Sequence, residues 1–507
     1  MSVILRLTRD LTRGSWNNIA DTLDDHFFRC LIAAPDLLKK LFAAAPADWY
    51  RQHPRHEMWR ALFHAARRPH DLVDANARGR FRAWVEAQPA PHPRDFLLLQ
   101  DARLRDLLAH GWYEEASSLS DRVLASLRSP RALEMADAVP SAAIRCGIAK
   151  LLVGDVDAAA ILFAEALHWA TRTDEHPSAR DAAEHLALAH ALADRFAEAR
   201  AVLDSEPGPP TRTGARAGAF ARALVALNAL DLRGARAALS SIDRSPTGEA
   251  LSWIELHIRA RAALVDGTAC EMIHRLTGAL VTQAALFSPT SAPGAVLRGD
   301  LVSLYHGVDD LRAAQDVLAA PGLREEDPAL LLPRARHAFL LGRPDRALAL
   351  LRCEEPTRSS VPARLTASGA VLAAAAELAA SGTLSAPTLH QAASIVAHHG
   401  STWALIEATP ALRALLPAKA EAPTPWVYRE NAQLTRRERQ VLDALAMHDT
   451  LGDVAAALHV SVNTAKSHVR ALYRKLGAHS REEALRLSGS VGTAGANAEA
   501  GGIAQLA

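Results

Sequence analysis

A short helical phrase recurs seven times in the middle of the chain, at intervals that leave room for two helices each. It consists of an apolar run, a turn residue, mostly polar residues, a small residue five positions past the turn, and a second apolar run. That fifth residue is alanine in five copies, and Met272 and Arg312 break the rule. Repetition at such a period predicts an array of similar units rather than unrelated domains. The turn positions are Gly111, Gly154, Asp194, Leu230, Gly267, Gly307 and Gly342, separated by 43, 40, 36, 37, 40 and 35 residues.

Each copy of the phrase predicts a helical hairpin, because a turn residue can close one helix while an alanine lets the next helix cross it closely. Stacked hairpins bury apolar faces that a single hairpin leaves exposed. Only 5% of the residues are aromatic, and a core rich in alanine and leucine packs most naturally as close-set helices. The pattern resembles the tetratricopeptide-like repeats of bacterial regulators, although its spacing exceeds their period of about 34 residues. We therefore expect an all-α chain in which an antiparallel helical-hairpin superhelix presents a concave inner surface.

Composition and residue pattern divide the chain into five parts. Residues 1–90 are helical in pattern but do not fit the repeat, and residues 91–416 form the predicted array, a sensor or scaffold. Residues 417–433 concentrate proline, alanine and polar residues, which is typical of a linker. Residues 434–487 are a separate helical domain, and residues 488–507 are a Gly/Ala/Ser-rich tail that we expect to be disordered.

Capping patterns predict four short helices in residues 434–487. The capping residues are Thr435 with Glu438, Thr450 with Asp453, Ser461, and Ser480 with Glu483, and Gly477 ends the third helix. The apolar positions of the third helix advance by three and four residues and predict its core stripe: Val462, Ala465, Val469, Leu472 and Leu476.

The other face of this third helix is basic. Between Ser461 and Leu476 the chain has four basic residues and no acidic residue, although the whole chain has a formal net charge of only +1. Lysine and arginine on such a face can donate hydrogen bonds to guanine in the DNA major groove. A solvated helix face is the alternative interpretation of these charges taken alone. The basic residues are Lys466, Arg470, Arg474 and Lys475.

A motif in the same segment favours DNA binding. Fixed-spacing matches are Leu434-Thr435, Arg437-Glu438, Val441-Leu442, Leu445-Ala446, Asp453-Val454-Ala455, Ser461, Thr464-Ala465-Lys466, His468, Lys475-Leu476-Gly477 and Ser480-Arg481-Glu482-Glu483-Ala484. The segment thereby resembles the LuxR-type helix-turn-helix module, a four-helix DNA-binding domain. Three departures, His448, Asp453 and Ala465, concern packing and the first helical turn rather than the groove face.

The resemblance implies roles for individual residues on double-stranded DNA. Lys466, Ser467 and Arg470 would read base edges. A second set would set register, mainly through phosphates: Ser461, Asn463, Thr464, His468, Arg474 and Lys475. In that family the fourth helix commonly carries a dimer contact, for which Ala484, Leu485 and Leu487 are the candidates, so we expect a homodimer on DNA.

Several motifs are absent from the sequence. There is no G-x-x-x-x-G-K-[ST] phosphate loop, so the chain looks like a MalT-like regulator without its ATPase. There is no strand–helix alternation of a receiver domain and no recognisable catalytic constellation, so we expect no enzymatic activity and no cofactor. The 22 histidines lack metal-ligand spacing, and the four cysteines form no CxxC pair, so we expect neither a metal site nor a disulfide.

These patterns lead to two hypotheses. The first is a sequence-specific transcriptional regulator whose array senses a small molecule or a protein partner in its groove. The alternative is an adaptor, in which the array binds another protein and DNA contact is secondary. The chain has no stretch of about 18 uncharged apolar residues and no signal-peptide pattern, so we expect a cytoplasmic, nucleoid-associated protein that does not contact the membrane.

Overall fold

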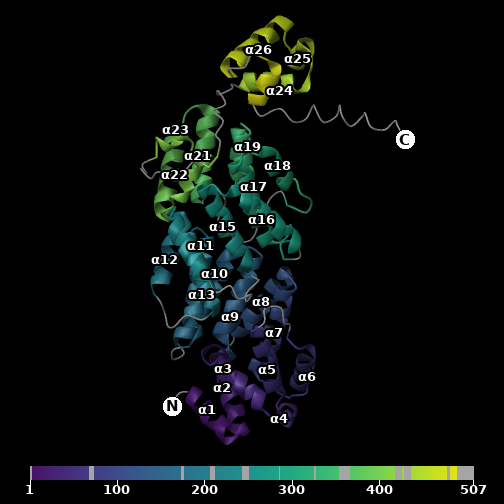
Figure 1. Cartoon of the computed structure of the whole chain (residues 1–507), viewed down its shortest axis with the longest axis vertical. Helices are drawn as coiled ribbons and strands as arrows, with labels where there is room; N and C mark the ends of the chain where they lie inside the picture. The colour runs from purple at the N-terminus through teal and green to yellow at the C-terminus, as the bar shows by residue number, and fades with distance from the viewer. Residues whose placement is uncertain are drawn as a thin grey trace, which may run out of the picture.

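The computed structural model describes residues 3–67, 73–128, 130–172, 176–205, 212–242, 251–284, 286–324, 327–352, 366–416, 425–426, 436–476 and 480–487. All secondary structure within these ranges is helical, as predicted. Figure 1 shows the helices following one another along one long axis, from the purple N-terminal helices to the yellow C-terminal domain. None of the described helices combines the length and apolarity that crossing a lipid bilayer requires.

The N-terminal helices do not follow the repeated phrase. They are α1 (Val3–Arg13), α2 (Trp16–Ala33), α3 (Pro35–Ala44), α4 (Ala47–Gln52), α5 (Pro54–Arg67) and α6 (Ala75–Glu86). They are joined to the next helices by polar contacts: the backbone N–H groups of Phe28 and Arg29 donate to the carboxylate of Asp137, at 2.9 and 3.2 Å. One continuous apolar core extends from Leu7 to Ala189, so packing is not interrupted near residue 90.

The central helices pack in antiparallel succession. They are α7 (Pro93–Ala109), α8 (Tyr113–Leu127), η1 (Pro130–Met135), α9 (Val139–Leu152), α10 (Val156–Arg172), α11 (Ser178–Leu192), α12 (Phe196–Asp204), α13 (Arg212–Asn228), α14 (Leu232–Ser240), α15 (Ser252–Asp266), α16 (Ala269–Thr282), α17 (Ala292–Gly307), α18 (Leu311–Leu318), α19 (Pro328–Leu340) and α20 (Pro344–Arg352). After them come α21 (Ala367–Ser381), α22 (Ala386–His399), η4 (Trp403–Glu407) and α23 (Pro410–Arg413).

The hairpin turns share one backbone geometry. At Gly154, φ is +83°, its N–H donates to Leu151 O at 3.1 Å, and the N–H of Asp155 donates to Lys150 O at 2.9 Å. This pair of hydrogen bonds ends a helix on a left-handed residue and satisfies its last carbonyl groups. The carbonyl of Asp155 then accepts from the N–H of Ala159, so the residue after the turn also opens the next helix. The same bonds occur at Gly111, Asp194, Leu230, Asp309 and Gly342.

One predicted turn position is wrong. Gly307 is the last residue of α17, and the left-handed residue of this hairpin is Asp309, with φ of +59°. We predicted the turn at Gly307 because glycine has no steric penalty at positive φ, but aspartate also tolerates this conformation. The shift by two residues removes one exception to the rule, because the small residue five positions past Asp309 is Ala314.

The alanine rule itself is explained by burial. The residue five positions past the left-handed turn is at most 1% exposed in six hairpins: Ala116, Ala159, Ala199, Ala235, Ala314 and Ala347. Met272 holds the position in the remaining hairpin and is 6% exposed. A small side chain at this point lets consecutive helices approach closely, so the sequence pattern reflects a packing requirement.

The segment that we predicted as a linker is anchored at one described residue. Trp426 is 3% exposed and packs with Trp403 and Ile406 of η4. The guanidinium of Arg336 lies 4.5 Å from the centre of the Trp426 ring. The chain therefore returns to the central helices only eight residues before position 434. The remaining positions of residues 417–433, like the predicted tail 488–507, lie outside the described residues.

The C-terminal helices form a core of their own. They are α24 (Arg436–Met447), α25 (Leu451–Ala457), α26 (Val462–Leu476) and α27 (Arg481–Leu487). Their core includes Val441, Leu442, Leu445, Val454 and Leu458. In Figure 1 this domain lies at one end of the molecule, beyond the central helices.

Candidate nucleic-acid interface

The start of α26 is fixed by its flanking residues. His459 adopts a left-handed conformation, with φ of +54°, and ends the preceding helical segment. Ser461 then caps α26, because its Oγ accepts from the N–H of Thr464 at 3.1 Å. Upstream, Thr450 Oγ1 accepts from the N–H of Asp453 at 3.2 Å, which confirms the predicted cap of α25. Local capping chemistry thus sets the direction in which α26 leaves the turn.

The inner face of α26 matches the predicted stripe at its three middle positions, and the side chain of Leu476 lies outside the described ones. Ala465, Val469 and Leu472 are at most 6% exposed. Val462 is 50% exposed, so its predicted place in the core is wrong. The side chain of Val460, in the turn before the helix, packs against the domain core. Val462 is the first residue of α26.

The outer face of α26 carries the residues predicted to contact DNA. Its exposed side chains are Asn463, Thr464, Lys466, Ser467 and Arg470, while His468 is half-buried. Neither Lys466 nor Arg470 makes an ion pair with any other residue that the structure describes. Arg474 and Lys475 belong to the last turn of α26, and their side chains lie outside the described ones.

Three hydroxyl groups on or beside this face are already hydrogen-bonded to nearby residues. Ser467 Oγ donates to the carbonyl of Asn463 at 3.0 Å. The hydroxyls of Ser461 and Thr464 lie 2.7 Å apart. Both arrangements leave acceptor capacity on the oxygens, since a hydroxyl has one proton and two lone pairs.

Two arginines outside the outer face connect elements of the domain by hydrogen bonds to backbone carbonyl groups. Arg437 Nη2 donates to the carbonyl of Leu458 at 3.1 Å, which joins α24 to the end of α25. Arg481 Nη1 donates to the carbonyl of Asp449 at 2.9 Å, and its Nη2 lies 3.1 Å from the Asp449 carboxylate. Both arginines stand at motif positions, but the sequence pattern gave no sign that they bond to backbone carbonyls. Their role is to hold the helices that support α26.

The fourth helix, α27, supplies part of the domain core. The Ser480 hydroxyl accepts from the N–H of Glu483 at 3.1 Å, as predicted. Ala484 is fully buried, and Leu485 packs partly against the same core. The side chain of Leu487 lies outside the described residues. Ala484 is therefore covered by its own chain, whereas Leu485 is only partly buried.

A capped basic helix, held by a short turn over a small apolar core, defines a helix-turn-helix domain. Residues 432–488 match the profile of the bacterial regulatory proteins of the luxR family. This segment is a LuxR-type helix-turn-helix domain, and it implies DNA binding and transcription regulation. The match covers no part of the large helical region that precedes it.

Short stretches of the chain are also similar to known transcriptional regulators. The chain is 35% identical over 69 residues to the HTH-type transcriptional activator RamA of Corynebacterium glutamicum, which covers 14% of this chain and 25% of RamA. It is 42% identical over 52 residues to the probable transcriptional regulatory protein NarL of Mycobacterium tuberculosis, which covers 10% of this chain and 24% of NarL. The matched segment thus spans about a quarter of each relative.

Proposed function

We propose that the chain is a sequence-specific DNA-binding transcriptional regulator, in which α26 enters the major groove. The observation that carries this proposal is the exposed basic face of α26, opposite its buried stripe. Lys466 and Arg470 are one helical turn apart and make no ion pair with a described residue, so their donors are available to base edges. Ser467, next to Lys466, can accept a hydrogen bond at the same groove floor, because its one proton is donated to the carbonyl of Asn463.

The neighbouring residues are proposed to fix register on the DNA backbone. Ser461, Asn463 and Thr464 stand at the start of α26, where unpaired N–H groups favour a phosphate. His468, Arg474 and Lys475 would contact phosphates farther along the helix. Residues 434–487 contain nine Lys or Arg and six Asp or Glu, a net of +3. Such a domain binds DNA with an affinity that falls steeply as salt rises.

We propose a homodimer on DNA, with α27 at the contact. Leu485, which is only partly buried, supports this. Leu487 is a second candidate from the sequence, and its side chain lies outside the described ones. Ala484 is fully buried and would contribute only by packing α27 onto the domain core. A symmetric dimer would read two half-sites about 10 base pairs apart or a multiple of that distance. The proposed place of action is the bacterial nucleoid in the cytoplasm.

We propose further that the helical region is a tetratricopeptide-like superhelix that senses an effector and controls the LuxR-type domain. The recurring left-handed turns and buried alanines support the repeat. The anchoring of Trp426 supports the control, because the covalent path to the DNA-binding domain starts from a residue packed among the central helices. A change in that packing would alter how the domain is tethered.

Genome-wide mapping of bound DNA in the native bacterium tests the proposal against the adaptor alternative. The wild type is compared with the Lys466→Ala/Arg470→Ala double variant and with Asp443→Ala, an exposed control on α24. We expect discrete occupied sites for the wild type and the control, and loss of occupancy and of the transcript changes for the double variant at equal abundance. Loss of occupancy with unchanged cellular activity would instead support the adaptor.

A further inference from the structure

The central helices line a large, partly open cavity. Its volume is about 910 Å³, in the range of small-molecule sites. Its walls come from α15, α17 and α19, from hairpin turns including that at Gly154, and from Trp403 and Ile406 of η4. Trp426 also lines it, so the cavity touches the anchor of the segment that leads to the DNA-binding domain.

One stripe of α15 runs along the cavity. Trp253, His257 and Arg261 all line it and are spaced four residues apart, so they lie on one face of the helix. Eight residues of α-helix advance by about 12 Å. The stripe therefore changes from an indole through an imidazole to a guanidinium over that distance.

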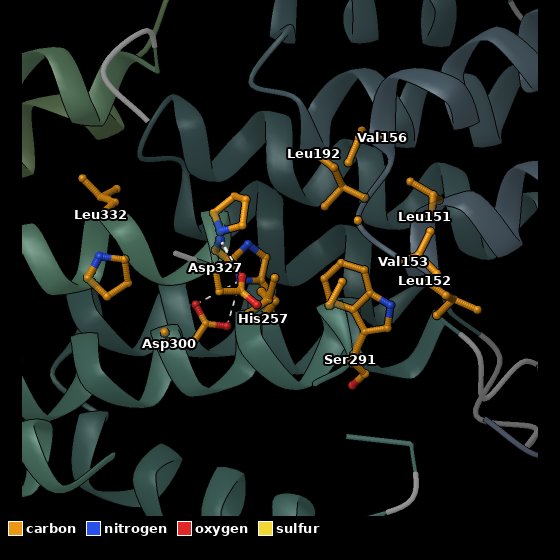
Figure 2. Close-up of a pocket in the computed structure, with 18 of the residues that line it drawn as sticks. Leu151, Leu152, Val153, Val156, Leu192, His257, Ser291, Asp300, Asp327 and Leu332 are labelled. Atoms are coloured by element: carbon orange, nitrogen blue, oxygen red, sulfur yellow. Dashed lines mark hydrogen bonds and ion pairs between the residues drawn. The ribbon is translucent and has the colours of Figure 1, made fainter. Parts of the chain in front are cut away.

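The cavity is apolar at the Trp253 end. Figure 2 shows the side chains of Leu151, Leu152, Val153, Val156 and Leu192 gathered on one side of the cavity. They belong to α9, α10, α11 and the turn at Gly154, so this apolar wall is built by the hairpins themselves. Burying an apolar group here would stabilise its binding by about 25 cal/mol for each Å² of apolar surface removed from water.

Most charges along the cavity are compensated inside the protein. His257 Nδ1 lies 2.8 Å from one carboxylate oxygen of Asp300 and 3.0 Å from the other (Figure 2). Arg336 forms a two-bonded ion pair with Glu407 and donates to Ser303 at 2.9 Å. Asp327 accepts from the N–H of Ala329 at 3.0 Å, and burial raises the pKa of this carboxyl.

Arg261 on α15 has no such partner among the described residues, and neither do the exposed Arg324 and Glu115 at the cavity wall. The Arg261 guanidinium lies 4.4 Å from the centre of the Trp403 ring, but it forms no hydrogen bond or ion pair with another residue that the structure describes. Burial lowers the pKa of Arg261, against the attraction of Asp194 and Asp300. A guanidinium keeps its charge in proteins, so its donors face the cavity without an acceptor. Such a group favours an incoming anion with paired oxygens.

We propose that this cavity binds an elongated amphipathic organic acid, with its carboxylate at Arg261 and its apolar body extending past His257 and Trp253 toward Leu151. The apolar wall and the cation lie at opposite ends of the α15 stripe, which fixes the direction of the ligand. The His257 ring, at the middle, offers its second nitrogen to a polar substituent. This inference rests on the proposed sensing function only for the link between ligand binding and DNA.

Calorimetric titration of the full chain tests the site with three probes that share one tail: decanoate, decan-1-ol and decylammonium. We expect decanoate to bind at least tenfold more tightly than decan-1-ol and decylammonium to bind most weakly. Equal binding of the three, tighter binding of decylammonium, or no binding of any probe would overturn the proposal.

Two substitutions on α15 sharpen the test. Arg261→Met should weaken decanoate binding at least tenfold and leave decan-1-ol unchanged, whereas Arg261→Lys should retain part of the preference for decanoate. Arg259→Met is the matched control, because Arg259 pairs with Glu255 and does not line the cavity. An unchanged preference in a folded Arg261→Met variant would overturn the proposal. If that variant does not fold, the comparison of the three probes on the wild type still decides.

DNA titration with and without decanoate separates this inference from the proposed function. Decanoate binding with unchanged DNA affinity would keep the site and contradict its sensing role. Intact DNA binding with no decanoate binding would contradict the ligand class alone.

Discussion

The guanidinium of Arg336 on α19 holds the carboxylate of Glu407 in η4, although 71 residues separate them in the chain. Two bonds of 2.9 and 2.5 Å join the groups, and their side chains are 7% and 1% exposed. The pair lies beneath Trp426, whose ring faces the same guanidinium. It therefore connects the central helices, η4 and the start of the path to the DNA-binding domain.

Removing the charge of Glu407 should be strongly destabilising. Glu407→Gln leaves the buried Arg336 guanidinium without its counter-charge, and breaking one partner of a buried pair costs about 3–5 kcal/mol. Urea unfolding of wild type and variant measures the difference. The control is Glu134→Gln, in the exposed pair with Arg131, which should cause no measurable loss. Equal, small effects of both substitutions would contradict a structural role for the buried pair.

The alanine of a hairpin should tolerate no enlargement. Ala199 on α12 is fully buried, so Ala199→Leu should lower the free energy of unfolding by about 1–3 kcal/mol through overpacking. Ala201 on the same helix is exposed, and Ala201→Leu should change stability by about 0.5 kcal/mol at most. Denaturant melts of the two variants give the comparison, and similar values would show that the repeated alanine is not a packing requirement.

Stability should fall in mild acid because of buried histidines. Burial, with Arg343 and Arg346 nearby, lowers the pKa of His337 to about 4, and burial also lowers the pKa of His306, whose Nε2 lies 3.0 Å from His337 Nδ1. An unfolded histidine has a pKa of about 6.5. Between pH 6.5 and about 4 the unfolded chain binds protons that the folded chain excludes, so the free energy of unfolding decreases as pH falls.

Unfolding of wild type and His337→Gln at pH 7 and pH 5 measures this effect. Each such histidine contributes up to about 1.4 kcal/mol per pH unit, so the variant should lose less stability between the two pH values than the wild type. Identical losses would mean that His337 is protonated in the folded chain as readily as in the unfolded one.

Trp426 should matter for stability as well as for tethering. Trp426→Ala removes a side chain that is 3% exposed and covers the Arg336 guanidinium, and large-to-small core changes of this kind cost about 3–5 kcal/mol. Trp112, which is 56% exposed, is the matched control, and Trp112→Ala should have a much smaller effect. Thermal unfolding of both variants and of the wild type measures the two losses of stability. A Trp426→Ala protein as stable as the wild type would show that residues 417–433 are a linker throughout.

The sequence predictions were mostly correct where the interacting residues are close together in the chain and failed where they are far apart. The caps at Thr450, Ser461 and Ser480 depend on residues three positions away, and all three were predicted correctly. The buried stripe of α26 also follows from local periodicity, but periodicity did not show that Val462, at the first position of the helix, is exposed. The turn at Asp309 was misplaced because the nearby glycine gave the stronger local signal.

Long-range packing left no local signal. Trp426 stands in a proline-rich, polar stretch whose composition is typical of a linker, and its burial depends on Arg336, Trp403 and Ile406. The cavity could not be predicted either, because its walls come from turns and helices between Gly111 and Trp426. The exposed basic face of α26 was predictable because one helix carries both the periodicity and the charges.

Selection from random-sequence duplex DNA by the purified full chain tests the central claim most directly. The wild type and the Lys466→Ala/Arg470→Ala variant are carried through the same rounds at the same salt concentration. We predict that the wild type enriches one motif, with half-sites about 10 base pairs apart or a multiple of that distance, and that the folded variant enriches none. No enrichment by the wild type, or the same motif from both proteins, would contradict the assignment of α26 as the reading helix.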